Sequence, residues 1–291
     1  MAADYPFMWV DAFTGTAMGG NPCAVVFGAE AIPVETRVAY VRETGLVECA
    51  YLQHSDRADF GARYYMADKE ILLAGHPTIA TCAALERAGM LRGRDSFTLE
   101  VGAGVIPIDV TRGAGPTVFT MTQFAPEFGR EYPPGEIAAL LGLSPDDILG
   151  TPRTVSTGTA FCVTVLRDHD TLRQARLDLE AFAAYRPSTD FNEPFLCVTE
   201  GFTEAGDTSA RMMMLPPLPA EDPFTGSATG CMACYLWANG LIAAPRFVAE
   251  QGHWMGRPGM AQVEVLGPRD AITGVRVGGS GVVLMDGKVR L

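Results

Sequence analysis

The sequence contains few basic residues. Its 291 residues include 22 Lys and Arg against 34 Asp and Glu, which gives a formal net charge of −12. Nucleic acids and anionic membrane surfaces are bound by basic patches, so neither is expected as a partner. The first residues, MAADYPFMWVDAF, lack the basic start and apolar stretch of a secretory signal. We therefore expect a cytoplasmic protein without nucleic-acid or membrane partners.

The sequence also lacks a recognisable metal or phosphate motif. Its seven cysteines are odd in number and scattered, which predicts free thiols in a reducing compartment. Cys231 and Cys234 have the spacing of a metal or redox pair, but no second Cys/His pair with zinc spacing accompanies them. The Gly-rich segment 14–22 matches neither the dinucleotide-binding nor the P-loop pattern. Helix packing and turn formation explain these residues.

No apolar run is long enough for a membrane span. Residues 223–245 carry no charge, but Thr, Ser, Gly, Asn and Pro interrupt the segment, and a span needs about 20 continuous apolar residues. Pro223 and Ser227 near its front and Gly240 at its end are helix start and stop signals. A helix that is uncharged all round is a buried helix. Its N-terminus would present free N–H groups and a positive dipole end, which bind anions such as carboxylates.

The same pattern occurs a second time, in residues 71–91. With an offset of 151 residues between the two segments, His76 corresponds to Ser227, and four positions are identical: Gly75 and Gly226, Thr78 and Thr229, Leu85 and Leu236, and Gly89 and Gly240. We interpret this as a duplicated unit. If the N-termini of two such helices converge, they form one site at the joint between two lobes.

The length and the order of the elements predict two α+β lobes. A chain of 291 residues is at the upper limit for one hydrophobic core. Strand patterns outnumber helix patterns, so each lobe is expected to be a curved, mostly antiparallel sheet wrapped around its central helix. The proline-broken segment 123–128 suggests a linker between an N-terminal lobe, 1–125, and a C-terminal lobe, 126–291, whose closing strands could cross over to the first lobe. We also predict a hairpin over 281–291 that turns at Asp286-Gly287.

Glu48 is the unusual acidic residue of the first lobe. It lies in a predicted strand, 46–53, with apolar neighbours such as Val47 and Cys49. A carboxylate in an apolar strand costs free energy unless it is paired, or its pKa rises. An outward-facing glutamate on a half-exposed strand fits the pattern equally well.

Six segments occur in the order of a known pattern. They read GGNPCAVVF (19–27), GLVECAYLQ (45–53), LAGHPTIAT (73–81), EDPFTGSATG (221–230), EQGHWMGRPG (250–259) and VRVGGSGVVLMDGKVRL (275–291). Over its whole length the chain resembles the phenazine-biosynthesis isomerase (PhzF-like) family, relatives of diaminopimelate epimerase. The resemblance implies a diaminopimelate epimerase-like fold of two similar lobes that face one another across a cleft. It also implies a homodimer without a metal or an organic cofactor.

The resemblance further implies proton transfer on a small carboxylated metabolite. Matched by position, the proton-shuttling glutamate is Glu48, its partner histidine is His76, and the aspartate is Asp222. Such chemistry needs a base held against the substrate and groups that stabilise the charge that develops. Asp222 would bind a substrate hydroxyl or amine, or fix the tautomer of His76. The residues expected to bind the substrate are Gly75, His76, Gly226, Ser227 and Asn21.

Departures from the family pattern leave the substrate open. Val47 and Cys49 replace the commoner Ser and Thr beside the glutamate, and Phe224 stands where a small residue is usual, so the pocket wall should be larger and less polar. Ala74 and Pro223 occupy the places of the two thiols of the diaminopimelate relatives, which argues against a two-thiol racemase. The sequence favours a cofactor-independent isomerase with Glu48 as acid and base. The alternatives are an epimerase or racemase of an amino or hydroxy acid, and a non-catalytic small-molecule binder.

Overall fold

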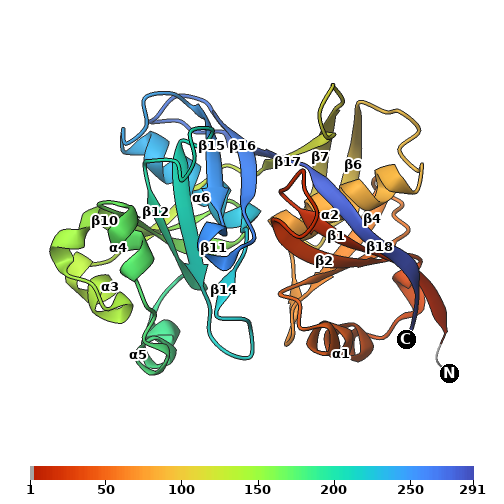
Figure 1. The fold of residues 1–291 in the computed structure, drawn as a ribbon, viewed down its shortest axis with the longest axis horizontal. Helices are drawn as coiled ribbons and strands as arrows, with labels where there is room; N and C mark the ends of the chain where they lie inside the picture. The colour runs from red at the N-terminus through yellow and green to blue at the C-terminus, as the bar shows by residue number, and fades with distance from the viewer. Residues whose placement is uncertain (1–2) are drawn as a thin grey trace. The chain divides into compact units, whose positions relative to one another are not determined.

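The structure, a computed structural model, describes residues 3–291, which divide into two compact units. Within the described residues, unit 1 is discontinuous in sequence and consists of the residues up to Thr122, Pro217–Pro219 and Gly278–Leu291. Unit 2 consists of Gln123–Pro216 and Ala220–Val277. Unit 1 therefore contains both ends of the chain, and in Figure 1 the blue C-terminal strand runs beside the red N-terminal strand.

The elements of the first half of the chain are mostly strands. They are β1 (Asp4–Ala12), β2 (Asn21–Val26), α1 (Val34–Thr44), β3 (Cys49–Gln53), β4 (Phe60–Tyr65), β5 (Glu70–Ile71), α2 (Gly75–Arg87), β6 (Ser96–Val101), β7 (Gly104–Thr111) and β8 (Val118–Gln123). Short 3-10 helices occupy Ala29–Ala31, Pro145–Asp147, Arg186–Ser188 and His253–Met255.

The elements of the second half follow a related order. They are β9 (Glu127–Glu131), α3 (Pro134–Leu141), β10 (Ile148–Ser156), β11 (Ala160–Leu166), α4 (His169–Gln174), α5 (Leu179–Tyr185), β12 (Glu193–Val198), β13 (Thr208–Met213), β14 (Glu221–Asp222), α6 (Gly226–Ala238), β15 (Arg246–Gln251), β16 (Gly259–Leu266), β17 (Gly274–Gly279) and β18 (Gly281–Arg290). None of the helices in the described residues is long and apolar enough to cross a membrane.

The two units share one scheme of strand pairing. In unit 1, β1–β2, β3–β4, β4–β5 and β6–β7 are antiparallel, whereas β2–β3 and β4–β6 are parallel. In unit 2, β10–β11, β12–β13, β13–β14 and β15–β16 are antiparallel, whereas β11–β12 and β13–β15 are parallel. The same order of antiparallel and parallel pairs confirms the predicted α+β fold with a mostly antiparallel sheet in each unit.

Each unit contains one long buried helix, α2 in unit 1 and α6 in unit 2. Each helix has 13 residues, of which 11 are buried. The two helices begin 151 residues apart, at Gly75 and Gly226. The hydroxyl of Thr78 donates to the carbonyl oxygen of Ala74 at 2.7 Å, and the hydroxyl of Thr229 donates to that of Thr225 at 2.9 Å. The duplication seen in the sequence therefore extends to side-chain hydrogen bonds.

Two local predictions were wrong in detail. Residues 281–291 form no hairpin, because β18 is one continuous strand in which Asp286 and Gly287 lie opposite Met8 and Phe7 of β1. The strand around Glu48 begins only at Cys49, so this glutamate precedes β3 rather than lying inside it. The end of the expected linker belongs to β9, which pairs with β10.

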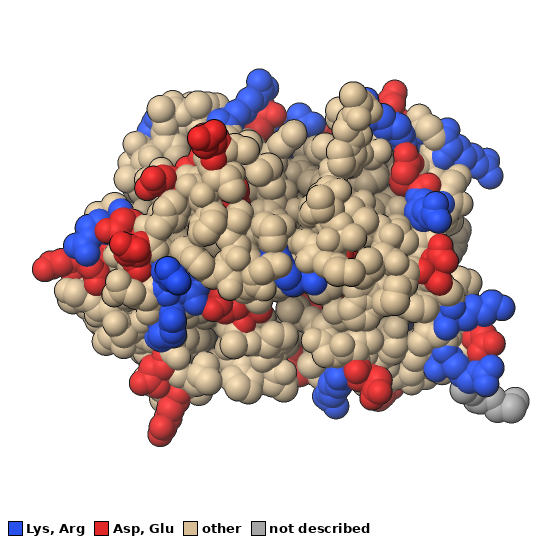
Figure 2. Space-filling model, in the orientation of Figure 1, with Lys and Arg blue, Asp and Glu red and all other residues tan. Residues whose placement is uncertain are grey.

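Charged residues are dispersed on the surface. On the face shown in Figure 2, acidic and basic side chains are interspersed among a larger number of uncharged residues. The basic side chains on this face form no continuous patch.

Candidate active site

Glu48 and His76 meet in unit 1. Glu48 comes just before β3, and His76 is the second residue of α2. The Oε2 atom of Glu48 lies 3.5 Å from Nδ1 of His76, and the two side chains are only 13% and 3% exposed. This separation is too long for a strong hydrogen bond. The carboxylate therefore faces the imidazole in a largely buried place, which is the inward of the two orientations that the sequence left open.

The imidazole of His76 is neutral at physiological pH. Burial lowers the pKa of His76 to about 3, because desolvation disfavours the charged ring, and this effect outweighs the attraction of a carboxylate 3.5 Å away. A neutral imidazole has one N–H donor and one acceptor nitrogen. Within the described residues, Nε2 of His76 is buried without a hydrogen-bond partner. One ring nitrogen thus faces Glu48, and the other is available to a ligand.

The N-terminus of α2 lies at the same place. Its cap residue, Ala74, has no side chain that could accept a hydrogen bond from the first turn. The first N–H groups of a helix have no partner within the helix and carry partial positive charge. This end is therefore suited to a negatively charged group next to His76. The fully buried hydroxyl of Tyr64, which is 2.9 Å from the hydroxyl of Thr78, helps to fix the first turn.

Asn21 lies on the neighbouring strand. It is the first residue of β2 and is fully buried opposite Ala12 of β1. β2 runs parallel to β3, with Ala24 opposite Cys49. The structure therefore places Asn21 in the same unit as Glu48, on a different segment from either Glu48 or His76.

Asp222, Gly226 and Ser227 lie together in unit 2. Asp222 ends β14 and is buried, and its Oδ2 atom accepts a hydrogen bond of 2.5 Å from the hydroxyl of Thr225. Gly226 and Ser227 are the first two residues of α6, whose cap residue, Thr225, likewise makes no side-chain cap hydrogen bond. Each unit thus combines an uncapped helix start with a buried or largely buried carboxylate.

Two glutamines that the sequence did not single out hold the start of α6. The amide of Gln123 donates to the carbonyl oxygen of Gly226 at 2.9 Å. The amide of Gln251 donates to the carbonyl oxygen of Asp222 at 2.7 Å and accepts from the backbone N–H of Thr225 at 3.0 Å. Neither residue stands in a pattern that marks it, since each acts through contacts with residues 26 or more positions away.

No thiol stands at either helix start. The cap residues are Ala74 and Thr225, which correspond to each other at the offset of 151 residues. All seven cysteines are free and buried. Burial raises the pKa of Cys231 to about 11 and that of Cys234 also well above its usual range, which makes both thiols inert packing groups. Among the described residues, no group of three or more His, Cys, Asp and Glu side chains could hold a metal ion.

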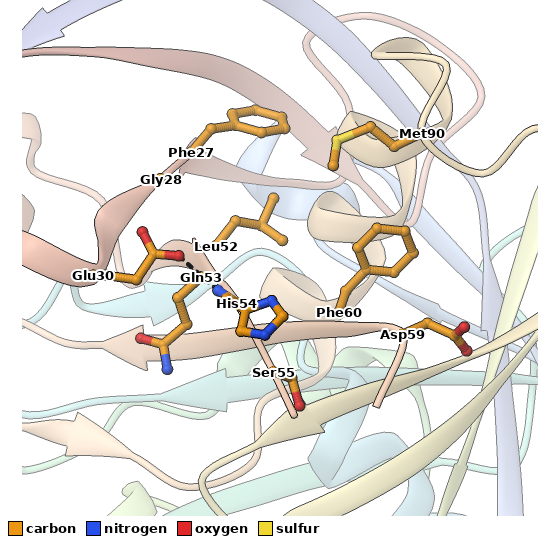
Figure 3. Close-up of a pocket in the computed structure, with 10 residues that line it drawn as sticks. All are labelled: Phe27, Gly28, Glu30, Leu52, Gln53, His54, Ser55, Asp59, Phe60 and Met90. Atoms are coloured by element: carbon orange, nitrogen blue, oxygen red, sulfur yellow. Dashed lines mark hydrogen bonds between the residues drawn. The ribbon is translucent and has the colours of Figure 1, made fainter. Parts of the chain in front are cut away.

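A groove on unit 1 is not part of this arrangement. It has a volume of about 350 Å³, with Phe27, Leu52, Phe60 and Met90 on its apolar side (Figure 3). Its Glu30 accepts a hydrogen bond of 2.6 Å from the backbone N–H of His54. Its second carboxylate, that of Asp59, accepts hydrogen bonds from the side chain of Arg94 and from the backbone N–H of Thr98. The groove therefore offers no counterpart of the Glu48–His76 pair.

Comparisons with known proteins match nearly the whole chain. The family model for phenazine biosynthesis-like proteins (PhzC-PhzF) matches residues 10–287. The chain is 29% identical to the trans-2,3-dihydro-3-hydroxyanthranilate isomerase of Pseudomonas aeruginosa, over 98% of this chain and 99% of that protein.

Two solved structures are also similar over nearly their full length. One is a PhzF-family phenazine biosynthesis protein of Bacillus anthracis, with 25% identity, coverage of 99% of both chains and a TM-score of 0.86. The other is a protein of Pseudomonas aeruginosa described as a predicted epimerase, with 29% identity, coverage of 98% of this chain and 99% of that chain, and a TM-score of 0.84.

The fold and these similarities define an isomerase, a class that includes the epimerases. The chain belongs to the phenazine biosynthesis-like (PhzC-PhzF) family.

Proposed function

We propose that this isomerase moves a proton on a small carboxylated metabolite by glutamate acid/base catalysis, without a metal or an organic cofactor. The observation that carries the proposal is the pair formed by Glu48 and a neutral, buried His76, whose facing atoms are 3.5 Å apart at the uncapped start of α2. Such a pair supplies a base, a hydrogen-bond donor and an anion-binding end of a helix at one place.

The reaction is neutral in protons and electrons. The carboxylate of Glu48 takes a proton from one carbon of the substrate, which breaks a C–H bond and forms an O–H bond. The electron pair moves through the neighbouring double bond, and Glu48 returns the proton to a second carbon. The neutral imidazole of His76 can stabilise the negative charge that develops by donating a hydrogen bond. One carboxyl group is sufficient for the whole transfer when both carbons lie on the same side.

Substrate binding requires a carboxylate site and a second polar site. We propose that Gly75 and His76 bind the substrate carboxylate through the first turn of α2, as expected for a helix N-terminus. Further substrate contacts are assigned to Asn21, Asp222, Gly226 and Ser227. Val47 and Phe224 are buried apolar residues that lie near Glu48 and Asp222 in the sequence. Their side chains favour a substrate with a larger apolar part than the substrate of the phenazine pathway has.

We further propose that the working form is a cytoplasmic homodimer. The support for this is the family resemblance, together with an excess of acidic over basic residues, 34 against 22, which disfavours binding to an anionic membrane surface or a nucleic acid. Light scattering coupled to size exclusion tests the assembly, and a mass of about one chain across a dilution series would contradict it.

The test begins with the substrate of the relative. Purified protein is incubated with trans-2,3-dihydro-3-hydroxyanthranilate and then with a panel of cyclic and aliphatic carboxylates, and double-bond migration is followed by absorbance and NMR. Wild-type protein, with or without EDTA, should convert at least one compound. Glu48→Gln should not, because the amide cannot accept the proton. Equal turnover by this variant would remove Glu48 from the reaction, and loss of turnover with EDTA would contradict metal independence.

Epimerisation is the second candidate, since one similar solved structure is described as a predicted epimerase. An epimerase returns the proton to the opposite face of the same carbon and therefore needs a second acid. Ala74 and Thr225 at the helix starts provide no thiol pair for this purpose. Turnover in D₂O separates the two reactions, because an epimerase places deuterium at a stereocentre without moving a double bond. Saturable binding without any exchange would instead indicate a non-catalytic binder.

A further inference from the structure

The side chain of Gln251 makes three hydrogen bonds at the start of α6. This residue ends β15 and is 2% exposed. Its Oε1 atom accepts from the backbone N–H of Thr225 at 3.0 Å. Its Nε2 atom donates to the carbonyl oxygen of Asp222 at 2.7 Å and to the hydroxyl of Thr225 at 3.2 Å. One buried amide thus connects both residues that flank the Pro223-Phe224 step.

Only one assignment of donors and acceptors is consistent with these hydrogen bonds. Because the backbone N–H of Thr225 can only donate, the amide oxygen of Gln251 must face it, and the NH₂ group must face Asp222 and the threonine hydroxyl. A hydroxyl has one proton, and that of Thr225 is donated to Oδ2 of Asp222 at 2.5 Å. The chain of donors therefore runs from Gln251 through Thr225 to the carboxylate of Asp222. Within this chain the position of the carboxylate depends on the amide.

The backbone of Gln251 is itself held on both sides. The buried carboxylate of Glu250 accepts hydrogen bonds from the backbone N–H groups of Phe202 and Thr203, at 2.6 and 3.0 Å. Gly252 follows with φ +86°, and a Cβ atom there would stand 2.6 Å from the carbonyl oxygen of Pro223. Because β15 is fixed to one loop before Gln251 and packs on Pro223 after it, the amide has a rigid support.

We propose that Gln251 is a positioning residue for Asp222, acting through Thr225 and through the backbone of Asp222. The inference rests on the proposed function in one respect, namely that Asp222 contacts the substrate. Gln251 itself touches neither substrate nor reacting atoms. Its role is to hold the Asp222 carboxylate in one rotamer, so that the carboxylate does not have to be ordered when the substrate binds.

Gln123 provides a matched control. It is also buried, and it also binds the start of α6, but its amide donates to the carbonyl oxygen of Gly226 and accepts from the hydroxyl of Thr157. Replacing Gln123 removes hydrogen bonds of the same kind from the same helix end. It leaves the chain from Gln251 to Asp222 in place.

The structural arm of the experiment needs no substrate. Crystal structures of Gln251→Met and Gln123→Met are determined, and both stabilities are measured by urea unfolding. In Gln251→Met the Asp222 carboxylate should leave the Thr225 hydroxyl, so that the 2.5 Å contact opens beyond 3.5 Å. In Gln123→Met this contact should persist at comparable loss of stability. An unchanged Asp222 in Gln251→Met, or an equal displacement in both variants, would overturn the proposal.

The kinetic arm uses whichever carboxylate the wild-type protein converts. A displaced contact group costs about 10- to 100-fold in kcat/KM, so Gln251→Met should lose this much. Thr225→Ser keeps the hydroxyl and should retain activity, whereas Thr225→Val should behave like Gln251→Met. If Asp222→Asn is fully active while the structural arm succeeds, then the assignment of Asp222 to substrate binding fails and the positioning role of Gln251 stands.

Discussion

The starts of α2 and α6 have similar backbones, but the carboxylates beside them have different partners. In unit 1 the largely buried carboxylate of Glu48 faces a neutral imidazole at 3.5 Å, without a short hydrogen bond between them. In unit 2 the buried carboxylate of Asp222 accepts a hydrogen bond of 2.5 Å from Thr225. A base must be able to gain and lose a proton, whereas a recognition group is better fixed. The contrast fits the roles proposed for Glu48 in proton transfer and for Asp222 in substrate recognition.

The strand registers extend this comparison to a second glutamate. The short strands β5 and β14, which precede the central helices, pair with β4 and β13 and show how these two strands correspond. The pairing of β3 with β4 and of β12 with β13 then makes Cys49 the counterpart of Pro194. The residue before each is a glutamate, Glu48 in unit 1 and Glu193 in unit 2. Glu193 pairs with the guanidinium of Arg186 at 3.1 Å. Equivalent carboxylates thus face a neutral partner in one unit and a cation in the other.

The largest expected effect comes from exchanging these two glutamates for glutamine. Glu48→Gln should reduce kcat by about 10³-fold or more, because the proposed base is removed, and should leave urea unfolding nearly unchanged. Glu193→Gln should retain most of the activity and lose at most a modest amount of stability, since the partly exposed guanidinium of Arg186 would lose its ion pair with Glu193. Both properties are measured for both variants on the same converted carboxylate.

The proposed difference between the two units is contradicted if Glu193→Gln loses activity and Glu48→Gln retains it. An inactive Glu193→Gln with normal stability would place chemistry in unit 2. Circular dichroism of Glu48→Gln serves as the control for folding.

The next largest effect concerns pH. The folded-state pKa of His76, about 3, lies below the ordinary histidine pKa of 6.5, so the unfolded chain takes up a proton first as the pH falls. The stability due to this residue is therefore complete above pH 6.5 and is lost below it, at up to about 1.4 kcal/mol per pH unit. Between pH 7 and pH 5, wild-type protein should lose about 2 kcal/mol more stability in urea than His76→Gln does. Equal losses would mean that folded His76 is protonated beside Glu48.

Local signals in the sequence were sufficient for the duplicated helices and for the fold class. Segments of small and apolar residues, with Pro and Ser or Thr near the front and Gly at the end, predicted buried helices, and the structure begins them at Gly75 and Gly226. The constant offset between them reflects a real repeat, because the strand pairing around each helix is the same. These features are encoded within short windows and need no knowledge of distant residues.

Features that depend on distant partners could not be predicted. Asp286-Gly287 is a strong turn signal, yet β18 pairs with β1 from the other end of the chain, and nine residue pairs outweigh one local preference. The orientation of Glu48 stayed open for the same reason, since only the packed structure places His76 opposite it. Gln123 and Gln251 stand in no pattern, and their roles are visible only through their contacts with α6.

A glycine in α6 provides a smaller effect that separates the two helices. Gly230 corresponds by the offset to Ile79 of α2, and a Cβ atom at Gly230 would stand 2.1 Å from the amide oxygen of Gln123. Gly230→Ala should therefore destabilise unit 2 by about 1–3 kcal/mol despite the better helix propensity of alanine. Combining it with Gln123→Ala should recover part of this loss, and urea unfolding measures both. No recovery would mean that the glycine is required for another reason.

The smallest predicted effect has the opposite sign and lies in unit 1. Gly287 stands within β18 at an exposed position. A Cβ atom there would meet only a ring carbon of Phe7, at an ordinary contact distance of 3.5 Å. Because the folded strand accepts the side chain without strain, Gly287→Ala should stabilise the protein by about 0.4–1 kcal/mol, chiefly by restricting the unfolded chain. A rise in the urea midpoint at unchanged slope checks this. A fall would show that the Asp286-Gly287 step still needs the conformational freedom of a turn, and that the pairing of β18 with β1 is weaker than its nine residue pairs indicate.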